Sequence, residues 1–204
     1  MIGGPKFIPN KHPAHPPQIA AYHINKEIGM KKVLVFATVL MFPAFAMAEA
    51  GGKGDLNDAQ IAHIVVTANQ VDIENGQLAK KKASREDVHA FAHRMIGEHT
   101  DVNKQATDLA AKLKVTPEDN PISKSLKEDG KKNLDKLKNL SGNEFDKAYI
   151  DSEIKLHQQV IDVADTKLVP SVKNEELKAL LVKVRPALVS HLEHAQKIQG
   201  SAGK

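Results

Sequence analysis

The sequence contains no cysteine, and aromatic residues make up only 4% of its 204 residues. The absence of cysteine excludes disulfide bonds, thiolate catalysis, zinc–thiolate sites and iron–sulfur clusters. The shortage of aromatic rings, beside an ample supply of Leu, Val, Ile and Ala, favours packed helices over a β-sandwich. The sequence therefore predicts an all-α fold whose core holds without covalent cross-links.

A net positive charge is also absent from most of the chain. The formal net charge is +4, with 29 Lys and Arg residues against 25 Asp and Glu residues. Residues 1–48 contain five lysines and one glutamate, so the whole excess belongs to them and the rest of the chain is neutral. A neutral domain gives no electrostatic reason to bind nucleic acid or an anionic membrane.

Residues 30–48 have the three parts of a secretory signal peptide. Met30-Lys31-Lys32 is positively charged, residues 33–45 are almost entirely apolar, and Ala46-Met47-Ala48 fits the small-x-small cleavage rule. The apolar run is too short for a comfortable membrane span, which favours a cleaved signal over an uncleaved anchor. We expect cleavage after Ala48 and a periplasmic or secreted protein.

Residues 1–29 precede this signal and show neither a helical nor a strand period. Signal peptides normally begin at the initiator residue, so we interpret residues 1–29 as a mis-annotated upstream extension and Met30 as the start. The alternative is a His-rich metal-binding tail, because His12 and His15 lie in this stretch. A folded tail ahead of a signal would hinder export.

The rest of the chain predicts one helical domain. A flexible linker is expected at residues 49–56, the domain at 57–198 and a flexible tail at 199–204. Potential helix caps and helix-breaking prolines divide the domain into segments with a helical period. The expected long helices cover residues 57–82, 84–114, 141–168 and 174–198, with Asn57, Ser84, Ser141 and Asn174 as caps, Pro170 ending the third helix and Pro186 bending the fourth.

Residues 122–140 form an amphipathic connector between the second and third long helices, with an interruption expected at Gly130. A helix of about 18 residues, rising 1.5 Å per residue, is long enough to cross the bundle lengthwise. This connection makes the second and third helices parallel. The predicted fold is therefore a ferritin-like four-helix bundle with one long helical crossover.

Several polar residues fall on the apolar stripes of these helices. A spacing of about 100° per residue turns their side chains toward the interior, where a polar group costs several kcal/mol unless it is paired or metal-bound. The residues on the stripes are His99, His157, His191, Asp72, Asp146 and Glu153. With parallel second and third helices, His99 and His157 lie about 15 residues from one end, and Asp72 and Glu153 lie about 11 from it. His191 lies within about two turns of that level, so these five residues can converge.

Two interpretations follow. His99, His157, His191, Asp72 and Glu153 could hold iron, manganese, zinc or copper, which accept imidazole and carboxylate ligands. Alternatively, the polar groups satisfy one another in a structural network that includes Asp146 and Tyr149. We expect three other helical histidines, His89, His93 and His194, to be solvated.

Four short motifs occur in order along residues 55–198. They are Asp72-x-x-x-Gly76-x-x-Ala79, Val88-x-x-Phe91-Ala92-x-x-Met95-x-x-x-His99, Phe145-Asp146-x-x-Tyr149 with His157, and Pro186 with His191-Leu192. In this order they resemble the exported bacterial proteins grouped as domain-of-unknown-function family 4142. The resemblance implies a ferritin-like bundle and an exported location, and it brings no activity. Many of the family's members are labelled membrane proteins, but no apolar segment near 20 residues follows the signal.

The chain departs from the di-iron ferritins, which carry Glu-x-x-His on two helices. Ile96 stands three residues before His99, and Leu188 stands three residues before His191. No phosphate-binding loop, nucleophile elbow or His-Glu-x-x-His motif is present either. The sequence favours a non-enzymatic exported module for partner binding or stress, with a non-ferroxidase metal site, which could be redox-active, as the alternative. It leaves open a homo-oligomer and a protein partner.

Overall fold

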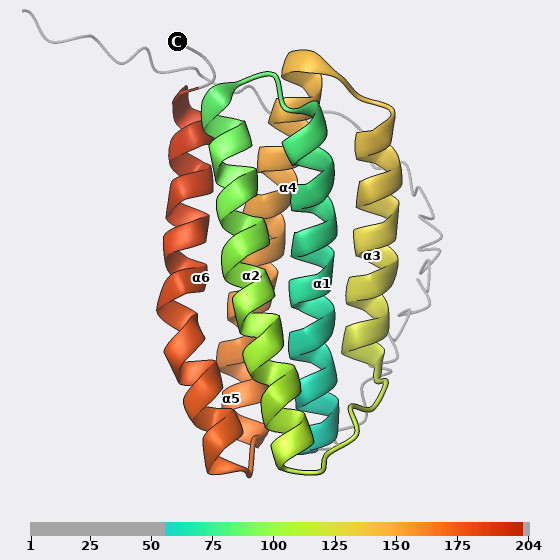
Figure 1. Cartoon of the computed structure of the whole chain (residues 1–204), viewed down its shortest axis with the longest axis vertical. Helices are drawn as coiled ribbons and strands as arrows, with labels where there is room; N and C mark the ends of the chain where they lie inside the picture. Colours follow the sequence, from blue (N-terminus) through green and yellow to red (C-terminus); the bar gives the residue numbers. More distant parts are fainter. Residues whose placement is uncertain (1–55, 202–204) are drawn as a thin grey trace, which may run out of the picture. The chain divides into compact units, whose positions relative to one another are not determined.

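A bundle of four long helices makes up most of the described structure, a computed structural model that covers residues 56–201 (Figure 1). The prediction of an all-α, ferritin-like bundle is confirmed. The expected upstream extension, signal peptide and most of the linker lie outside the described residues. The long helices are α1 (Asp58–Lys82), α2 (Glu86–Lys112), α4 (Gly142–Val163) and α6 (Glu175–Ser201).

The predicted long crossover is helix α3 (Pro121–Lys138), which packs mainly against α1. Because α3 carries the chain back along the bundle, α2 and α4 run in the same direction, and α1 and α6 run in the opposite one (Figure 1). Each long helix contacts two others, in the order α1, α2, α6, α4 and back to α1. A side chain on any of the four inner faces can therefore reach a common centre.

Helix α4 leads into two short segments, the π-helical η1 (Ala164–Leu168) and α5 (Val169–Ser171). Pro170 does not end the helical path at once, because it lies in α5, which follows η1 directly with helical backbone angles. The helical path continues to Ser171. A π-helical turn is rare and is often found at functional sites.

The helix caps agree in part with the sequence. Asn57 forms a capping box with Gln60, and the Asn174 side chain accepts from the backbone N–H of Glu176 and Leu177. Ser141 makes no side-chain cap bond. Glycine at position 142 has φ of +55°, a conformation that residues with a side chain rarely adopt.

The turn before helix α2 is held by a residue of another helix, and the N-cap of α2 is Arg85 rather than Ser84. The buried carboxylate of Asp146 in α4 accepts from the backbone N–H of Ser84 and Arg85, at 3.0 and 2.9 Å, and from the Ser84 hydroxyl at 2.5 Å. A full negative charge is a stronger acceptor than a hydroxyl. The expected Ser84 cap is therefore wrong, because Ser84 is a donor here.

The interruption expected at Gly130 does not occur, since α3 continues through it. Gly130 faces Val71 of α1 so closely that an added Cβ would lie 2.7 Å from Val71 Cγ2. Glycine serves here to let α3 approach α1, rather than to break a helix. At the other end of the domain, α6 extends to Ser201, beyond the expected end at residue 198.

The core has two apolar halves separated by a polar layer. The aromatic cluster, at the N-terminal ends of α2 and α4, contains Phe91, Phe145 and Tyr149. The aliphatic cluster, at the other end, contains among others Ile64, Leu168 and Leu181. Between them on the four long helices lie the buried polar residues Asn69, Asp72, His99, Glu153, His157 and His191.

Within the described residues, no helix combines the length and apolar character that crossing a membrane needs.

Candidate metal centre

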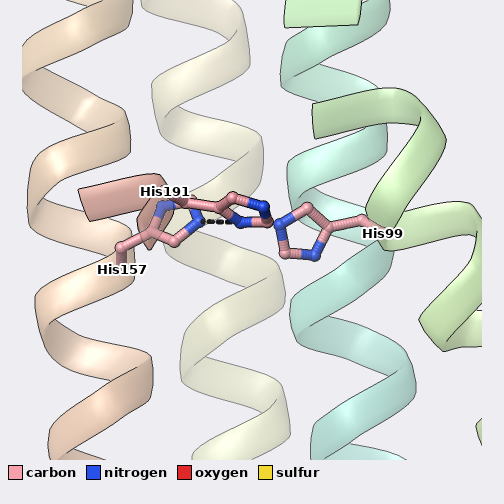
Figure 2. Close-up of side chains that lie close together, drawn as sticks. All are labelled: His99, His157 and His191. Atoms are coloured by element: carbon pink, nitrogen blue, oxygen red, sulfur yellow. Dashed lines mark hydrogen bonds between the residues drawn. The ribbon is translucent and has the colours of Figure 1, made fainter. Parts of the chain in front are cut away.

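Three buried histidines from three helices meet in the polar layer. His99 lies on α2, His157 on α4 and His191 on α6, and each is at most 3% exposed. Their rings point toward one another (Figure 2), with centroids 5.1 to 5.6 Å apart. The structure thus brings together the three histidines that the sequence placed on apolar stripes.

The tautomer of His99 follows from its partner. His99 Nδ1 lies 2.8 Å from Asn69 Oδ1. The Asn69 amide is itself oriented, because its Nδ2 donates to the Val65 carbonyl oxygen at 3.0 Å. His99 Nδ1 must therefore carry the proton. Its Nε2 is left with a lone pair, is buried and has no hydrogen-bond partner in the described structure.

His157 is fixed in the same way by its own helix. Its Nδ1 lies 2.9 Å from the backbone carbonyl oxygen of Glu153, which can only accept a hydrogen bond. Nδ1 therefore carries a proton. In neutral His157 the lone pair of Nε2 then points at His191 Nδ1, 3.2 Å away (Figure 2).

A carboxylate on the neighbouring helix orients His191. Its Nε2 donates to Glu98 Oε2 at 2.7 Å, and Arg94 Nε donates to Glu98 Oε1 at 2.8 Å. Burial raises the pKa of Glu98, but the hydrogen bonds from Arg94 and His191 outweigh it and bring that pKa below its usual value. Burial lowers the pKa of His191 to about 4. Neutral His191 therefore holds its proton on Nε2 and has a lone pair on Nδ1.

Three nitrogen lone pairs thus face a common point. The ligand atoms that His99, His157 and His191 can offer lie within 4.8 Å of one another. Each second ring nitrogen donates to an oxygen: an amide, a backbone carbonyl or a carboxylate. This pattern is typical of metal-binding histidines, whose outer hydrogen bonds fix the ring and its tautomer.

A proton shared between His157 and His191 would also satisfy their contact. It would leave the buried Nε2 of His99 without a partner, since this atom has none in the described structure. A metal ion satisfies all three nitrogens at once. The third imidazole therefore favours the metal interpretation over a purely structural network.

Two buried acids adjoin the histidines. Asp72 Oδ2 lies 3.7 Å from His99 Nε2, and Asp72 Oδ1 and both oxygens of Glu153 have no partner among the described hydrogen bonds. Burial and the nearby charge of Asp72 raise the pKa of Glu153 well above its usual value. Glu153 is therefore the member of the pair that favours the neutral acid form.

Asp72 is the charged member of this pair. Burial raises the pKa of Asp72, but the electrostatic interaction with His99 and His157 brings it below its usual value. Asp72 lies 3.7 Å from His99 Nε2 and forms a second group of close ligand atoms with Glu153 and His157, so it is the candidate fourth ligand beside the three imidazoles. Such a nitrogen and oxygen set suits zinc, iron, copper or nickel.

The expected network of Asp146 and Tyr149 does not form in the described structure. Asp146 instead accepts from the backbone N–H groups of Ser84 and Arg85 in the turn between α1 and α2. The Tyr149 hydroxyl is buried without a partner, and burial, Glu153 and Asp72 raise its pKa well above the usual value. The side chains that shift the pKa of Tyr149 are therefore Glu153 and Asp72, and not Asp146.

The other helical histidines do not join the centre. His93 is exposed and His89 and His194 are half-buried, and the rings of His89 and His93 lie 5.1 Å apart. Sequence reasoning missed Asn69 and Glu98, which orient two of the rings. Asn69 was within reach of the helical period, since it stands three residues before Asp72 on one face of α1.

Comparison with known proteins gives one family and no individual relative. No curated protein and no solved structure matches the chain. The sequence profile described as "Domain of unknown function (DUF4142)" matches residues 43–198, which is most of the chain and includes every helix described above except the last residues of α6. The chain belongs to the DUF4142 family.

Proposed function

We propose that this protein is exported and binds one divalent transition metal ion inside its bundle. The ligands are His99 Nε2, His157 Nε2 and His191 Nδ1, with Asp72 as the fourth. The observation that carries the proposal is the set of three buried lone pairs, each fixed by a hydrogen bond on the opposite side of its ring. Glu98, Asn69 and the Glu153 carbonyl are the outer partners of the site.

A partner-binding module without a metal is less well supported. An apolar docking surface needs a patch of exposed hydrophobic side chains. Among the described residues the only large hydrophobic side chain that is strongly exposed is Val182, at 56%. The unusual chemistry of the described chain lies in its interior, so we assign the function there.

Export is part of the proposal because residues 30–48 have the pattern of a secretory signal peptide. The chain has no cysteine, so an exported protein of this sequence must bind its metal through imidazole and carboxylate groups. The site uses only these groups. Protein recovered from the periplasm should begin at Glu49, which mass spectrometry of the intact protein would show.

Metal titration of the purified protein tests the binding site. Co²⁺ or Zn²⁺ should bind at one ion per chain, as measured by calorimetry and elemental analysis after desalting. His99→Gln removes a ligand. It should therefore lower the affinity by more than the roughly 10- to 100-fold that is typical when a residue that only hydrogen-bonds to a ligand is replaced.

The matched control is His93→Gln, on the exposed side of the same helix. It should bind metal as tightly as the unchanged protein. Equal losses in the two variants, or no stoichiometric metal in the unchanged protein, would contradict the proposal.

A further inference from the structure

A cavity of about 90 Å³ adjoins the histidine centre. His99, His157, His191 and Asp72 line it, together with Asn69 and Glu98. All its other lining residues are aliphatic and belong to the half of the bundle that holds the aliphatic cluster. The metal ligands therefore form the polar part of a chamber whose remaining walls are apolar.

Several aliphatic residues that line this chamber are partly exposed to solvent. Val102, Val163, Val184 and Leu188 are half-buried, although they line the cavity. In the aromatic cluster, by contrast, Phe91 is 0% exposed. The partial exposure of these lining side chains means that the chamber is not sealed from solvent.

The π-helical segment contributes to the same wall. Ala164 begins η1 and Leu168 ends it, and both line the cavity. A π-turn widens the helix and displaces its side chains relative to an α-helix. The irregular part of the α4 path thus coincides with the chamber beside the metal ligands.

Volume and wall chemistry limit what can enter. A protein cavity of about 150 Å³ lined by aliphatic and aromatic side chains stays dry and binds benzene or xenon. A space of about 90 Å³ suits a smaller molecule. An ion would lose its hydration without gaining partners along the aliphatic walls, which costs many kcal/mol. The chamber therefore favours small uncharged molecules.

We propose that this chamber admits a small uncharged molecule, of the size of a diatomic gas, to the open side of the bound metal ion. The inference rests on the proposed metal site. All four ligands line the chamber, so the remaining coordination positions of the ion face it. A six-coordinate ion such as Fe²⁺, held by three imidazoles and one carboxylate, keeps open positions for an exogenous ligand.

Nitric oxide and azide test this inference, because they are an uncharged and an anionic ligand of similar small size. The protein is loaded with Fe²⁺ without oxygen, and metal content is measured first. Nitric oxide should then bind, as seen by absorbance and electron paramagnetic resonance, whereas azide at the same concentration should leave the spectrum unchanged.

Cavity-filling variants test the route. Val184→Phe and Val163→Phe place a ring in the chamber from α6 and α4, and each should slow nitric oxide association by roughly tenfold or more. Both should retain metal affinity. The matched control is Val182→Phe, because Val182 lies on the same helix and points outward, and it should leave the rate unchanged.

Xenon examines the cavity without any substitution. Methyl resonances of Val184 and Leu188 should shift under xenon in the metal-free protein, while those of Val182 should not. This result does not depend on whether a variant folds.

The outcomes separate the two proposals. If the protein takes up no metal, the proposed function fails. If it holds iron but nitric oxide does not bind, or azide binds as readily, the inference is overturned and the metal site stands. Nitric oxide association at the unchanged rate in both cavity variants, or an absence of xenon shifts, would also overturn it.

Discussion

At the scale of single residues, the metal site depends more on which ring nitrogen of each histidine carries the proton than on how deeply the ring is buried. The helical period places His99, His157 and His191 on inner faces, and their heights follow from parallel second and third helices. The sequence cannot show which ring nitrogen is free, because this depends on partners from other helices. Glu98 illustrates the limit: it lies outside the apolar stripe of α2 and reaches His191 only through the packing of α6 against α2.

Replacing Asn69 tests the hydrogen bond that orients the ring of His99. Asn69→Ala removes the oxygen that holds the proton of His99 on Nδ1, so the ring loses its fixed tautomer. Metal affinity should fall by roughly 10- to 100-fold, while all four ligands remain in place. Calorimetric titration with Zn²⁺ measures this, with exposed Asn143→Ala as the control. An unchanged affinity in Asn69→Ala would show that the tautomer is not set by this contact.

The low pKa of His191 predicts a loss of stability in acid. In the unfolded chain this pKa has its usual value of 6.5, whereas in the fold it is about 4 because of burial. Between these values the unfolded chain takes up a proton that the folded one does not, so the free energy of unfolding decreases as pH falls from about 6.5 to about 4. Above pH 6.5, His191 does not contribute to the pH dependence of the free energy of unfolding.

Urea denaturation of metal-free protein at pH 7 and pH 4.5 measures this effect. The raised pKa of Glu153 acts in the opposite sense, so the comparison is made against His191→Gln, which retains Glu153. The unchanged protein should lose more stability over this range than the variant. Parallel losses would contradict the assignment of the acid sensitivity to His191.

At the scale of helices, local sequence signals succeeded where the cap and its helix are adjacent in the chain. Asn57 and Asn174 cap their own helices, as their positions predict. The start of α2 was misjudged because Ser84 bonds to Asp146, from a helix about 60 residues later, instead of capping its own helix. Gly130 was misjudged for a similar reason, since its role is the close approach of α3 to Val71.

Asp146 therefore joins two helices, and removing it should be costly. Asp146→Ala leaves the backbone N–H groups of Ser84 and Arg85, in the turn before α2, without their acceptor, which should lower the free energy of unfolding by about 2 to 3 kcal/mol. Urea denaturation measures this. The matched control is Asp151→Ala on the same helix, whose exposed pairing with Lys147 should be worth less than about 1 kcal/mol. Equal effects would show that the bonds from Ser84 and Arg85 to Asp146 add no stability beyond that of an exposed ion pair.

At the scale of the bundle, the three-part interior connects fold and function. The aromatic cluster packs one end tightly, the aliphatic cluster leaves a chamber at the other, and the polar layer lies between them. The sequence predicted the four helices, their directions and the convergence of the polar residues. It could not predict the chamber, because empty space depends on how side chains of four helices interlock, and helix periodicity gives only the face on which each one lies.

Diffraction from crystals of the Zn²⁺-loaded protein, measured at the zinc absorption edge, tests the central assignment most directly. The anomalous map should show one strong peak between His99 Nε2, His157 Nε2 and His191 Nδ1, at about 2.0 to 2.1 Å from each nitrogen. A polar layer without density for an ion, or a peak only at the surface pair His89 and His93, would contradict it.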